Sequence, residues 1–113
     1  METDPRPTDA IQVVTATPTE AEAHRIGAAL VEQRLAACVQ VVGPITSIYR
    51  WQGRLEVSQE WLCIIKTRTA LYSSVEERIR ALHSYTLPEI LAFTVEHGER
   101  GYLDWLRQET TEP

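Results

Sequence analysis

The sequence predicts an α+β fold of the ferredoxin-like kind, in which an antiparallel sheet carries its two main helices on one face. Two kinds of periodicity lead to this fold class. Strand-like apolar runs and alternation mark residues 10–16, 36–67 and 89–96, whereas helical spacing marks residues 17–34 and 69–82. The middle stretch folds back on itself. The resulting order is strand, helix, strand, strand, helix, strand, followed by a short C-terminal helix.

The first helix has a clear start signal after the strand at residues 10–16. Thr17 is a candidate N-cap, Pro18 suits the first helical position, and Glu20 completes a capping box. The expected buried stripe consists of Ala23, Ile26, Gly27 and Leu30. Small side chains on this stripe allow close approach to a sheet, and we expect the helix to end near Arg34.

The hairpin at residues 36–67 organises the rest of the chain. Gln52-Gly53 separates its two arms, because Gly takes the positive φ that a two-residue loop needs. Gly43-Pro44 predicts a bulge, since Pro lacks the ladder N–H. At roughly 3.3 Å per residue, the part beyond Pro44 extends about 25 Å. One small subunit cannot cover so long an apolar ribbon, and we therefore expect a closed oligomer.

The second half of the chain is expected to form another helix and another strand. Thr69 is a candidate cap for the helix at residues 69–82, and residues 83–88 form a connecting loop. The strand at residues 89–96 is apolar on both faces, which indicates either a central position or an intersubunit contact. Tyr102, Leu103 and Leu106 mark one side of the terminal helix.

Composition limits the function classes. The net charge of -5 without a Lys/Arg cluster argues against nucleic acid or an anionic membrane as partner. No apolar run approaches the ~20 residues of a membrane span, and a signal-peptide core is missing, so we expect a cytoplasmic protein. Cys38 and Cys63 fit free thiols in a reducing compartment. Residues 1–9 are expected to be a disordered tail dispensable for folding, and residues 10–109 a single domain.

Three segments identify a family resemblance. Residues 34–53 (RLAACVQVVGPITSIYRWQG), 60–67 (EWLCIIKT) and 83–106 (HSYTLPEILAFTVEHGERGYLDWL) resemble the CutA family of divalent-cation-tolerance proteins. The resemblance covers residues 11 to about 109. It implies a homotrimer of ferredoxin-like subunits, similar in build to the PII nitrogen-signalling proteins. It also implies an association with copper and other divalent cations.

The resemblance suggests where a metal or small ligand binds. Glu60 and His83 are the candidate metal ligands, and Lys66, Tyr85 and Glu89 are candidates for an intersubunit cleft. The alternative is that His83 and Tyr85 only cap the helix and pack an interface. Tyr49, Trp51 and Trp61 are expected at the trimer interface, because aromatic side chains supply large buried areas.

Two departures from the family bear on copper. Some members place a Cys at the end of the first strand and an additional His just before the His-Pro-Tyr motif. The residues at those two positions here are Thr15 and Leu82, and Ser84 replaces the proline of the motif. Thiolate and imidazole hold copper well. Their replacement predicts copper binding no tighter than about micromolar.

The remaining candidates favour structural roles. His24 is expected to be solvated and His97 to serve a turn, and the two cysteines lack zinc-site spacing. The chain shows no nucleophile with a base, no phosphate loop and no paired carboxylates, so we expect no enzyme and no required cofactor. The leading hypothesis is a trimeric cytoplasmic protein of divalent metal tolerance or binding, for copper or zinc. The alternative is a PII-like signalling or scaffold trimer that binds a small effector or a protein partner.

Overall fold

The computed structural model describes residues 2–4 and 7–111 and confirms the predicted element order. Within these residues the strands are β1 (Ala10–Thr17), β2 (Cys38–Trp51), β3 (Arg54–Arg68) and β4 (Leu91–Thr94). The helices are α1 (Glu20–Glu32), α2 (Tyr72–Leu82) and α3 (Arg100–Glu109), with a 3-10 turn η1 (Thr69–Leu71) before α2. No helix in this described part is long and apolar enough to cross a bilayer.

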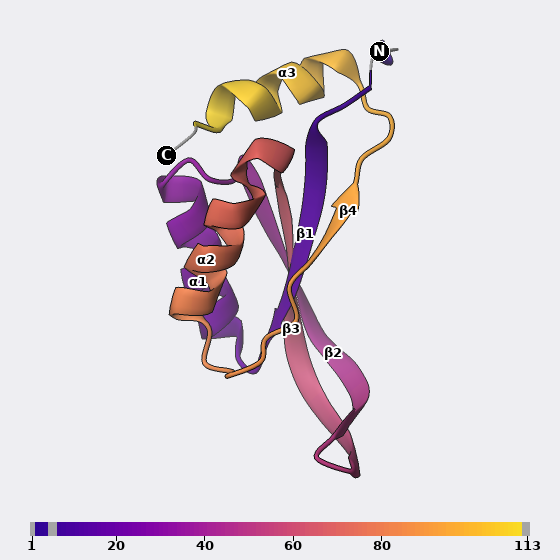
Figure 1. Ribbon diagram of the computed structural model, residues 1–113, viewed down its shortest axis with the longest axis vertical. Coiled ribbons are helices and arrows are strands. Elements are labelled where there is room, and N and C mark those ends of the chain that lie inside the picture. The colour runs from indigo at the N-terminus through magenta and orange to yellow at the C-terminus, as the bar shows by residue number, and fades with distance from the viewer. Residues whose placement is uncertain (1, 5–6, 112–113) are drawn as a thin grey trace.

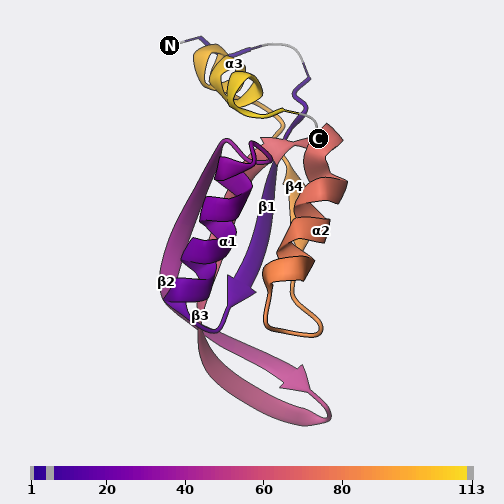
Figure 2. The same cartoon turned by 90° about the vertical axis from the view of Figure 1, so that its left-hand side faces the viewer.

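The strands form one antiparallel sheet in the order β2-β3-β1-β4. This is the strand order of the ferredoxin-like fold. Figure 1 and Figure 2 show α1 and α2 side by side over one face of the sheet, and α3 across one end of it. The opposite face carries no helix in either view.

The core fills the space between the sheet and the α1–α2 layer. Val13 and Ile65 point from the sheet into it, and the predicted stripe of α1 is buried, with Ile26 and Leu30 fully covered. Gly27 is the smallest residue of this stripe, and its lack of a side chain matters for packing. A Cβ added at Gly27 would lie 3.1 Å from Cγ1 of Val39, so glycine lets α1 approach β2 closely.

The hairpin has the predicted bulge and turn. The register of β2 against β3 shifts between Val42 and Ile45, which is the position that the sequence predicts for the bulge. Gln52 and Gly53 have φ angles of 50° and 79°, which is the pattern of a type I′ turn. The outer part, residues 45–60, is called the hairpin overhang below. It extends past the ends of both helices and gives the subunit its longest dimension, 47 Å against 25 and 21 Å (Figure 1).

The last strand is shorter than expected and lies at an edge. The sequence predicts a strand over residues 89–96, but β4 spans Leu91–Thr94 and pairs with β1 alone. Leu91 and Phe93 are 52% and 53% exposed. A central position is therefore wrong for the subunit, because β1 already has β3 on its other side. The sequence offered two interpretations of this apolar strand, and the one that remains is a contact between subunits.

Both main helices start differently from the prediction. β1 runs through Thr17, whose hydroxyl donates to the carbonyl of Thr19 at 2.8 Å. Thr19 is the N-cap of α1, and its hydroxyl accepts from the N–H of Glu22 at 3.1 Å. Thr69 does not cap α2, because the chain first makes the 3-10 turn and its hydroxyl donates to the carbonyl of Asp9. Competing polar partners shift each boundary by a few residues.

The C-terminal helix closes one end of the molecule. Leu103 and Leu106 of α3 pack on Ala10 and Ala37, as the predicted apolar side requires, whereas Tyr102 is 45% exposed. The helix ends are tied to the body by side chains from other elements. Arg34 donates to the Gln108 carbonyl and Thr111 hydroxyl, and Arg107 pairs with Asp9 at 3.4 Å.

The described part of the expected tail has partners near α3. The Asp4 N–H donates to the carbonyl of Gly98 at 3.0 Å, and Asp4 is 1% exposed. Thr8 donates its hydroxyl to the carbonyl of Val95 at 2.6 Å. Residues 1, 5 and 6 of the tail lie outside the described residues. The domain boundary at residue 10 therefore stays a prediction.

Candidate functional site

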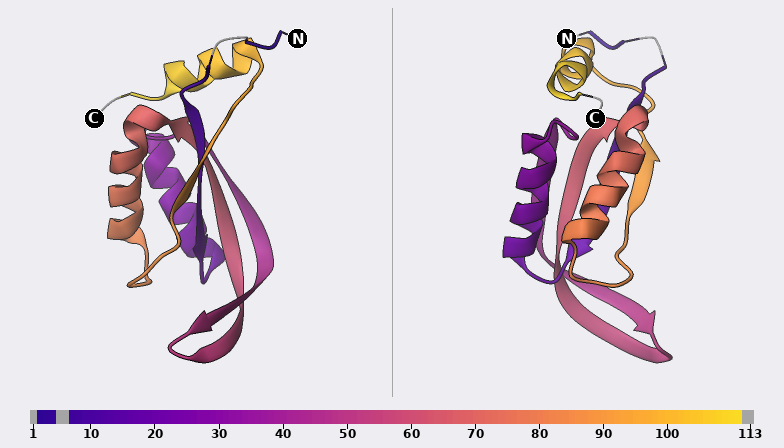
Figure 3. Two further views of the ribbon diagram at one scale, coloured as in Figure 1. Left: turned by 45° about the vertical axis from the view of Figure 1, so that its right-hand side comes forward. Right: turned by 60° about the vertical axis from the view of Figure 1, so that its left-hand side comes forward.

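A cavity of about 830 Å³ lies between the hairpin overhang and the segment that joins α2 to β4. Figure 3 shows this segment, in orange, at the same end of the sheet as the hairpin. Ala16, near the end of β1, forms part of the cavity wall. The cavity, called the hairpin cavity below, is lined by three carboxylates, three aromatic rings and a set of small or aliphatic residues: Glu56, Glu60, Glu89, Tyr49, Trp51, Tyr85, Ala16, Ser47, Ile48, Ser84, Thr86 and Leu87.

Sequence periodicity explains why the overhang supplies its side chains to the hairpin cavity. Ser47, Tyr49 and Trp51 alternate along β2, and each is directly paired with the residue opposite on β3. Tyr49 lies opposite Glu56, so the ring and the carboxylate share one face of the ribbon. The Tyr49 hydroxyl is 3.2 Å from Oγ of Ser58, which fixes the position of the ring.

Glu60 and Tyr85 form the polar centre of the cavity. The Tyr85 hydroxyl donates to Oε2 of Glu60 at 2.9 Å, and Glu60 is only 8% exposed. Burial, followed by this hydrogen bond and the charge of Glu60, raises the pKa of the Tyr85 phenol above its usual value. The phenol therefore stays protonated and keeps donating to the carboxylate. Glu60 was expected as a metal ligand and Tyr85 as part of a cleft, and this hydrogen bond joins the two side chains.

His83 lies behind the cavity wall and uses both ring nitrogens internally. Nε2 is 2.7 Å from the carbonyl of Ala16, so this nitrogen carries the proton and donates. Nδ1 then accepts from the N–H of Tyr85 at 3.1 Å. The ring also contacts the Tyr85 ring, with centroids 4.9 Å apart. His83 therefore positions Tyr85, and no nitrogen lone pair is left for a metal in this arrangement.

Glu22 is a residue of this region that the sequence interpretation missed. The sequence suggests a solvated helix face at this position, but Glu22 is 6% exposed. Its Oε2 accepts from both the N–H and the hydroxyl of Ser84, at 3.0 and 3.1 Å, and lies 3.4 Å from Nδ1 of His83. The i, i+4 spacing of Glu22, Ile26 and Leu30 was the signal that could have revealed its burial.

The described residues offer a poor copper site. No group of three or more His, Cys, Asp or Glu side chains in residues 2–4 and 7–111 could hold a metal ion together. Thr15 is fully buried, and its Oγ1 has no hydrogen-bond partner among these residues. Leu82 packs against the core. Thr15 and Leu82 therefore supply neither a sulfur nor a nitrogen ligand for copper. The carboxylates of the hairpin cavity are the ligands that remain.

The other predicted site residues lie apart from one another. Glu89 lines the hairpin cavity, whereas Lys66 lies further along β3, between Gln12 and Cys38, and does not line it. Tyr49 and Trp51 are about two-fifths exposed in the subunit, and their place at a trimer interface stays a prediction. Trp61 instead packs against the subunit's own core. The odd-numbered residues of β3 near Cys63 face the helices, and Trp61 is one of them.

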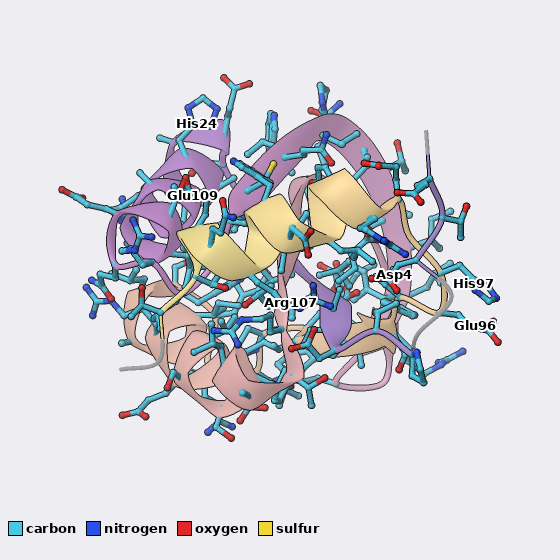
Figure 4. The ribbon with its side chains drawn as sticks, turned by 90° about the horizontal axis from the view of Figure 1, so that it is seen from above. Asp4, His24, Glu96, His97, Arg107 and Glu109 are labelled. Carbon is cyan, nitrogen blue, oxygen red and sulfur yellow. The ribbon has the colours of Figure 1, made fainter. Side chains whose placement is uncertain are left out.

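The histidines and cysteines outside this region do not gather. Figure 4 places His24 and His97 at opposite sides of the molecule. Cys63 is fully buried, and its thiol lies 3.7 Å from the carbonyl of Ala23. Burial, with a smaller contribution from the charge of Glu22, raises the pKa of the Cys63 thiol from 9.0 to about 11. Cys38 and Cys63 are both free.

Comparisons with known proteins show that the residues of the hairpin cavity lie within a match to a known family. The model of the family described as CutA1 divalent ion tolerance protein matches residues 11–109, a range that contains every residue lining the hairpin cavity. The "Divalent-cation tolerance protein CutA" of Thermus thermophilus is 51% identical over 98 residues, which are 87% of this chain and 95% of that protein.

Solved structures agree with this match over nearly the whole chain. The Cut A1 structure from Thermus thermophilus gives a TM-score of 0.88 at 49% identity, covering 90% of this chain and 99% of that one. CutA from Xylella fastidiosa gives 0.90 at 38% identity, with 92% and 100% covered. A structure from Archaeoglobus fulgidus, described as a periplasmic divalent cation tolerance protein, gives 0.86 at 37% identity, with 88% and 97% covered.

Proposed function

This chain belongs to the CutA1 divalent ion tolerance family, which has no known enzymatic activity, and from this premise we propose that it acts as a non-enzymatic cytoplasmic trimer in tolerance to divalent metal, including copper. The family match over residues 11–109 is the observation that carries the proposal. No cofactor is required for such a role. Copper or zinc would be cargo that the protein binds or buffers.

We expect direct metal binding to be weak and to depend on oxygen ligands. Glu60 is the carboxylate that the family resemblance assigns to the metal, and Tyr85 already occupies one of its oxygens. His83 has both nitrogens engaged, so it would join a metal only if its hydrogen bonds to Ala16 and Tyr85 were broken. Oxygen ligands alone hold copper less well than nitrogen and sulfur ligands do.

Calorimetric titration with Cu²⁺ and Zn²⁺, in competition with a chelator of known affinity, tests this expectation. We expect dissociation constants no tighter than about micromolar, weakened further in Glu60→Gln. Glu77→Gln is the matched control, because Glu77 is exposed on α2 and does not line the cavity. A nanomolar site with one ion per subunit that persists in both Glu60→Gln and His83→Ala would contradict the proposed ligand set.

The trimer is supported by the apolar surface that a single subunit leaves uncovered. On the hairpin overhang, Ile48 pairs directly with Val57, and together with Leu55 they are 62–69% exposed. On the sheet, Leu91 and Phe93 of the edge strand β4 face away from the helices and are about half exposed. Two separate apolar patches on one subunit suit head-to-tail contacts, which close into a ring. The number three comes from the family resemblance.

Sedimentation equilibrium tests the oligomer. We expect three times the 12.8-kDa mass of the chain at micromolar concentration. Phe93→Asp and Val57→Asp should each destroy the trimer, since each would bury a charge without a partner. Val31→Asp is the control, because Val31 is 41% exposed on α1, on the helix side of the subunit. A folded wild-type monomer at micromolar concentration would overturn the trimer.

The cytoplasmic location rests on the chemistry of the cysteines. Cys38 and Cys63 are both free, which suits a reducing compartment. The relative from Archaeoglobus fulgidus is described as periplasmic, so relatives do not all share one compartment. Cell fractionation with an antibody against the native protein tests the location, and recovery in a membrane-bounded oxidising compartment would contradict it.

A second candidate function is favoured by the hairpin cavity. A PII-like signalling or scaffold trimer would bind a small effector there or engage a protein partner, and Tyr85 and Glu89 are the residues that the sequence assigns to such a cleft. The comparison with PII proteins has a limit, because the turn at Gln52 and Gly53 is a tight one and offers no long effector loop. A thermal-shift screen against nucleotides and small acids tests this candidate.

A further inference from the structure

We propose that the hairpin cavity binds a linear organic diamine or polyamine, with its ammonium groups held by separate carboxylates and its methylene chain lying against the aromatic rings. This inference rests on the second candidate function and names its ligand class. The charge of the wall is the first argument. Glu56, Glu60 and Glu89 line the cavity, and no Lys, Arg or His is among the described residues that do so. Such a wall favours cations and disfavours the nucleotides and acids of the PII comparison.

Glu60 is the second argument, because its charge lacks a cationic partner. The side chain is 8% exposed, and no described residue forms an ion pair with it. Its Oε2 accepts one hydrogen bond from the Tyr85 hydroxyl, and its Oε1 accepts none from the described part of the chain. A buried carboxylate is costly unless a cation and further hydrogen bonds compensate the lost water. An ammonium group would supply both.

The aromatic rings are the third argument. Tyr49, Trp51 and Tyr85 line the same cavity as the carboxylates, and because Tyr49 and Trp51 are also expected at the trimer interface, the cavity would lie at the boundary between two subunits. The two tyrosines have fixed positions: the Tyr49 hydroxyl contacts Ser58, and the Tyr85 ring rests on His83 with its N–H bonded to Nδ1. Ring faces attract an ammonium group, and they also provide an apolar surface for methylene carbons.

The spacing of the carboxylates separates an organic cation from a metal ion. No three carboxylates or other ligating side chains among the described residues are close enough to hold one ion. The charges are instead distributed around a space of about 830 Å³. A compact divalent ion cannot contact separated carboxylates directly, because its bonds to oxygen are only about 2–2.6 Å long. A flexible chain with two or more ammonium groups can.

Calorimetry on the full-length protein tests the ligand class with matched probes. Butane-1,4-diamine and spermidine carry separated charges, butylamine carries one, and butane-1,4-diol has the same chain without charge. We expect one spermidine per subunit with submillimolar affinity, weaker binding of the diamine, at least about tenfold weaker binding of butylamine, and none of the diol. Butylamine binding as tightly as the diamine, or equal binding of the diol, would overturn the proposal.

Variants locate the site and separate it from general attraction to an acidic protein. Glu60→Gln should weaken spermidine binding by at least about tenfold. Glu89→Gln, at an exposed position that does not threaten folding, should weaken it several-fold. Glu77→Gln removes the same charge on α2 outside the cavity and should leave the affinity unchanged. Equal loss in all three variants would indicate unspecific attraction and overturn the proposal.

The same preparation distinguishes failure of this inference from failure of the proposed function. Copper titration and sedimentation are run beside the amine titration. An intact trimer that binds copper but no amine would overturn the amine site alone. Loss of the trimer would overturn the proposed assembly. If a basic side chain of a neighbouring subunit fills the cavity, amines will not bind and Glu60→Gln will instead weaken the trimer, which also overturns the amine site.

Discussion

Replacing Gly43 by alanine should destabilise the subunit through a clash with one indole ring. A Cβ at this position would lie 2.7 Å from Cγ and 2.9 Å from Nε1 of Trp61, and closer still to Cδ1. Real Cβ atoms do not approach other heavy atoms this closely. Trp61 cannot simply turn aside, because it is a rigid side chain packed against the core. Either the indole leaves the core or β2 moves at its bulge.

The expected cost is about 1–3 kcal/mol per subunit, the usual range for overpacking an ordered core. Urea denaturation followed by far-UV circular dichroism, at one fixed protein concentration, measures it as a shift in midpoint at unchanged slope. Gly53→Ala is the control for backbone strain. A Cβ there meets nothing within 4 Å, but φ is +79°, so its cost of roughly 1 kcal/mol would come from the backbone alone.

A double-mutant cycle identifies the clash as the cause. In a Trp61→Leu background the indole atoms are gone, so adding Gly43→Ala should cost almost nothing more. The reasoning is refuted if Gly43→Ala is as stable as the wild type. It is also refuted if the loss has the same size with and without the indole. Either result would mean that the close approach of Gly43 to Trp61 does not limit side-chain size at the bulge.

Buried groups near the cavity lead to two further predictions. Folding raises the pKa of the Cys63 thiol to about 11, so between pH 9 and 11 this thiol stays protonated in the folded state and ionises in the unfolded state. The free energy of unfolding should therefore fall by about 1.4 kcal/mol per pH unit over that range. Cys63→Ala should lack this part of the slope in urea titrations, and an identical slope would contradict the assignment. His83→Ala leaves the carbonyl of Ala16 and the N–H of Tyr85 without their partner, so we expect a loss of roughly 2–4 kcal/mol. Exposed His24→Ala should stay within about 0.5 kcal/mol, and equal losses in the same urea assay would contradict the buried role.

The order and type of the elements could be predicted because local physical rules decide them. Alternation along the hairpin, the missing N–H of Pro44 and the positive φ available to Gly53 act within a few residues. The buried stripe of α1 follows from helical spacing alone, as do Leu103 and Leu106 of α3. Exact starts were less certain. Thr17, Thr19 and Thr69 all could cap a helix. The Thr17 hydroxyl donates to the nearby carbonyl of Thr19 and the Thr69 hydroxyl to the distant carbonyl of Asp9, so of the three only Thr19 caps a helix.

The candidate site was only partly predictable, because its residues meet across long sequence separations. Glu60 was named as a metal ligand and Tyr85 as a cleft residue, and a hydrogen bond joins them. The N–H of Tyr85 is a local partner of His83, but nothing local indicated that the other ring nitrogen would be engaged as well, since its partner is Ala16 on β1. Glu22 looked like a surface carboxylate until Ser84 and His83 were placed beside it.

The sequence by itself therefore determined the elements, the bulge, the turn and the apolar stripes, because each depends on backbone preferences and periodicity within one segment. Only the tertiary structure decided that Trp61 turns toward the core, that Lys66 lies away from the cavity and that β4 is an edge strand. Periodicity fixes which residues share a face, but not which distant segment covers that face. That choice depends on how the whole chain packs, and it made Glu60 a buried carboxylate beside an aromatic cavity.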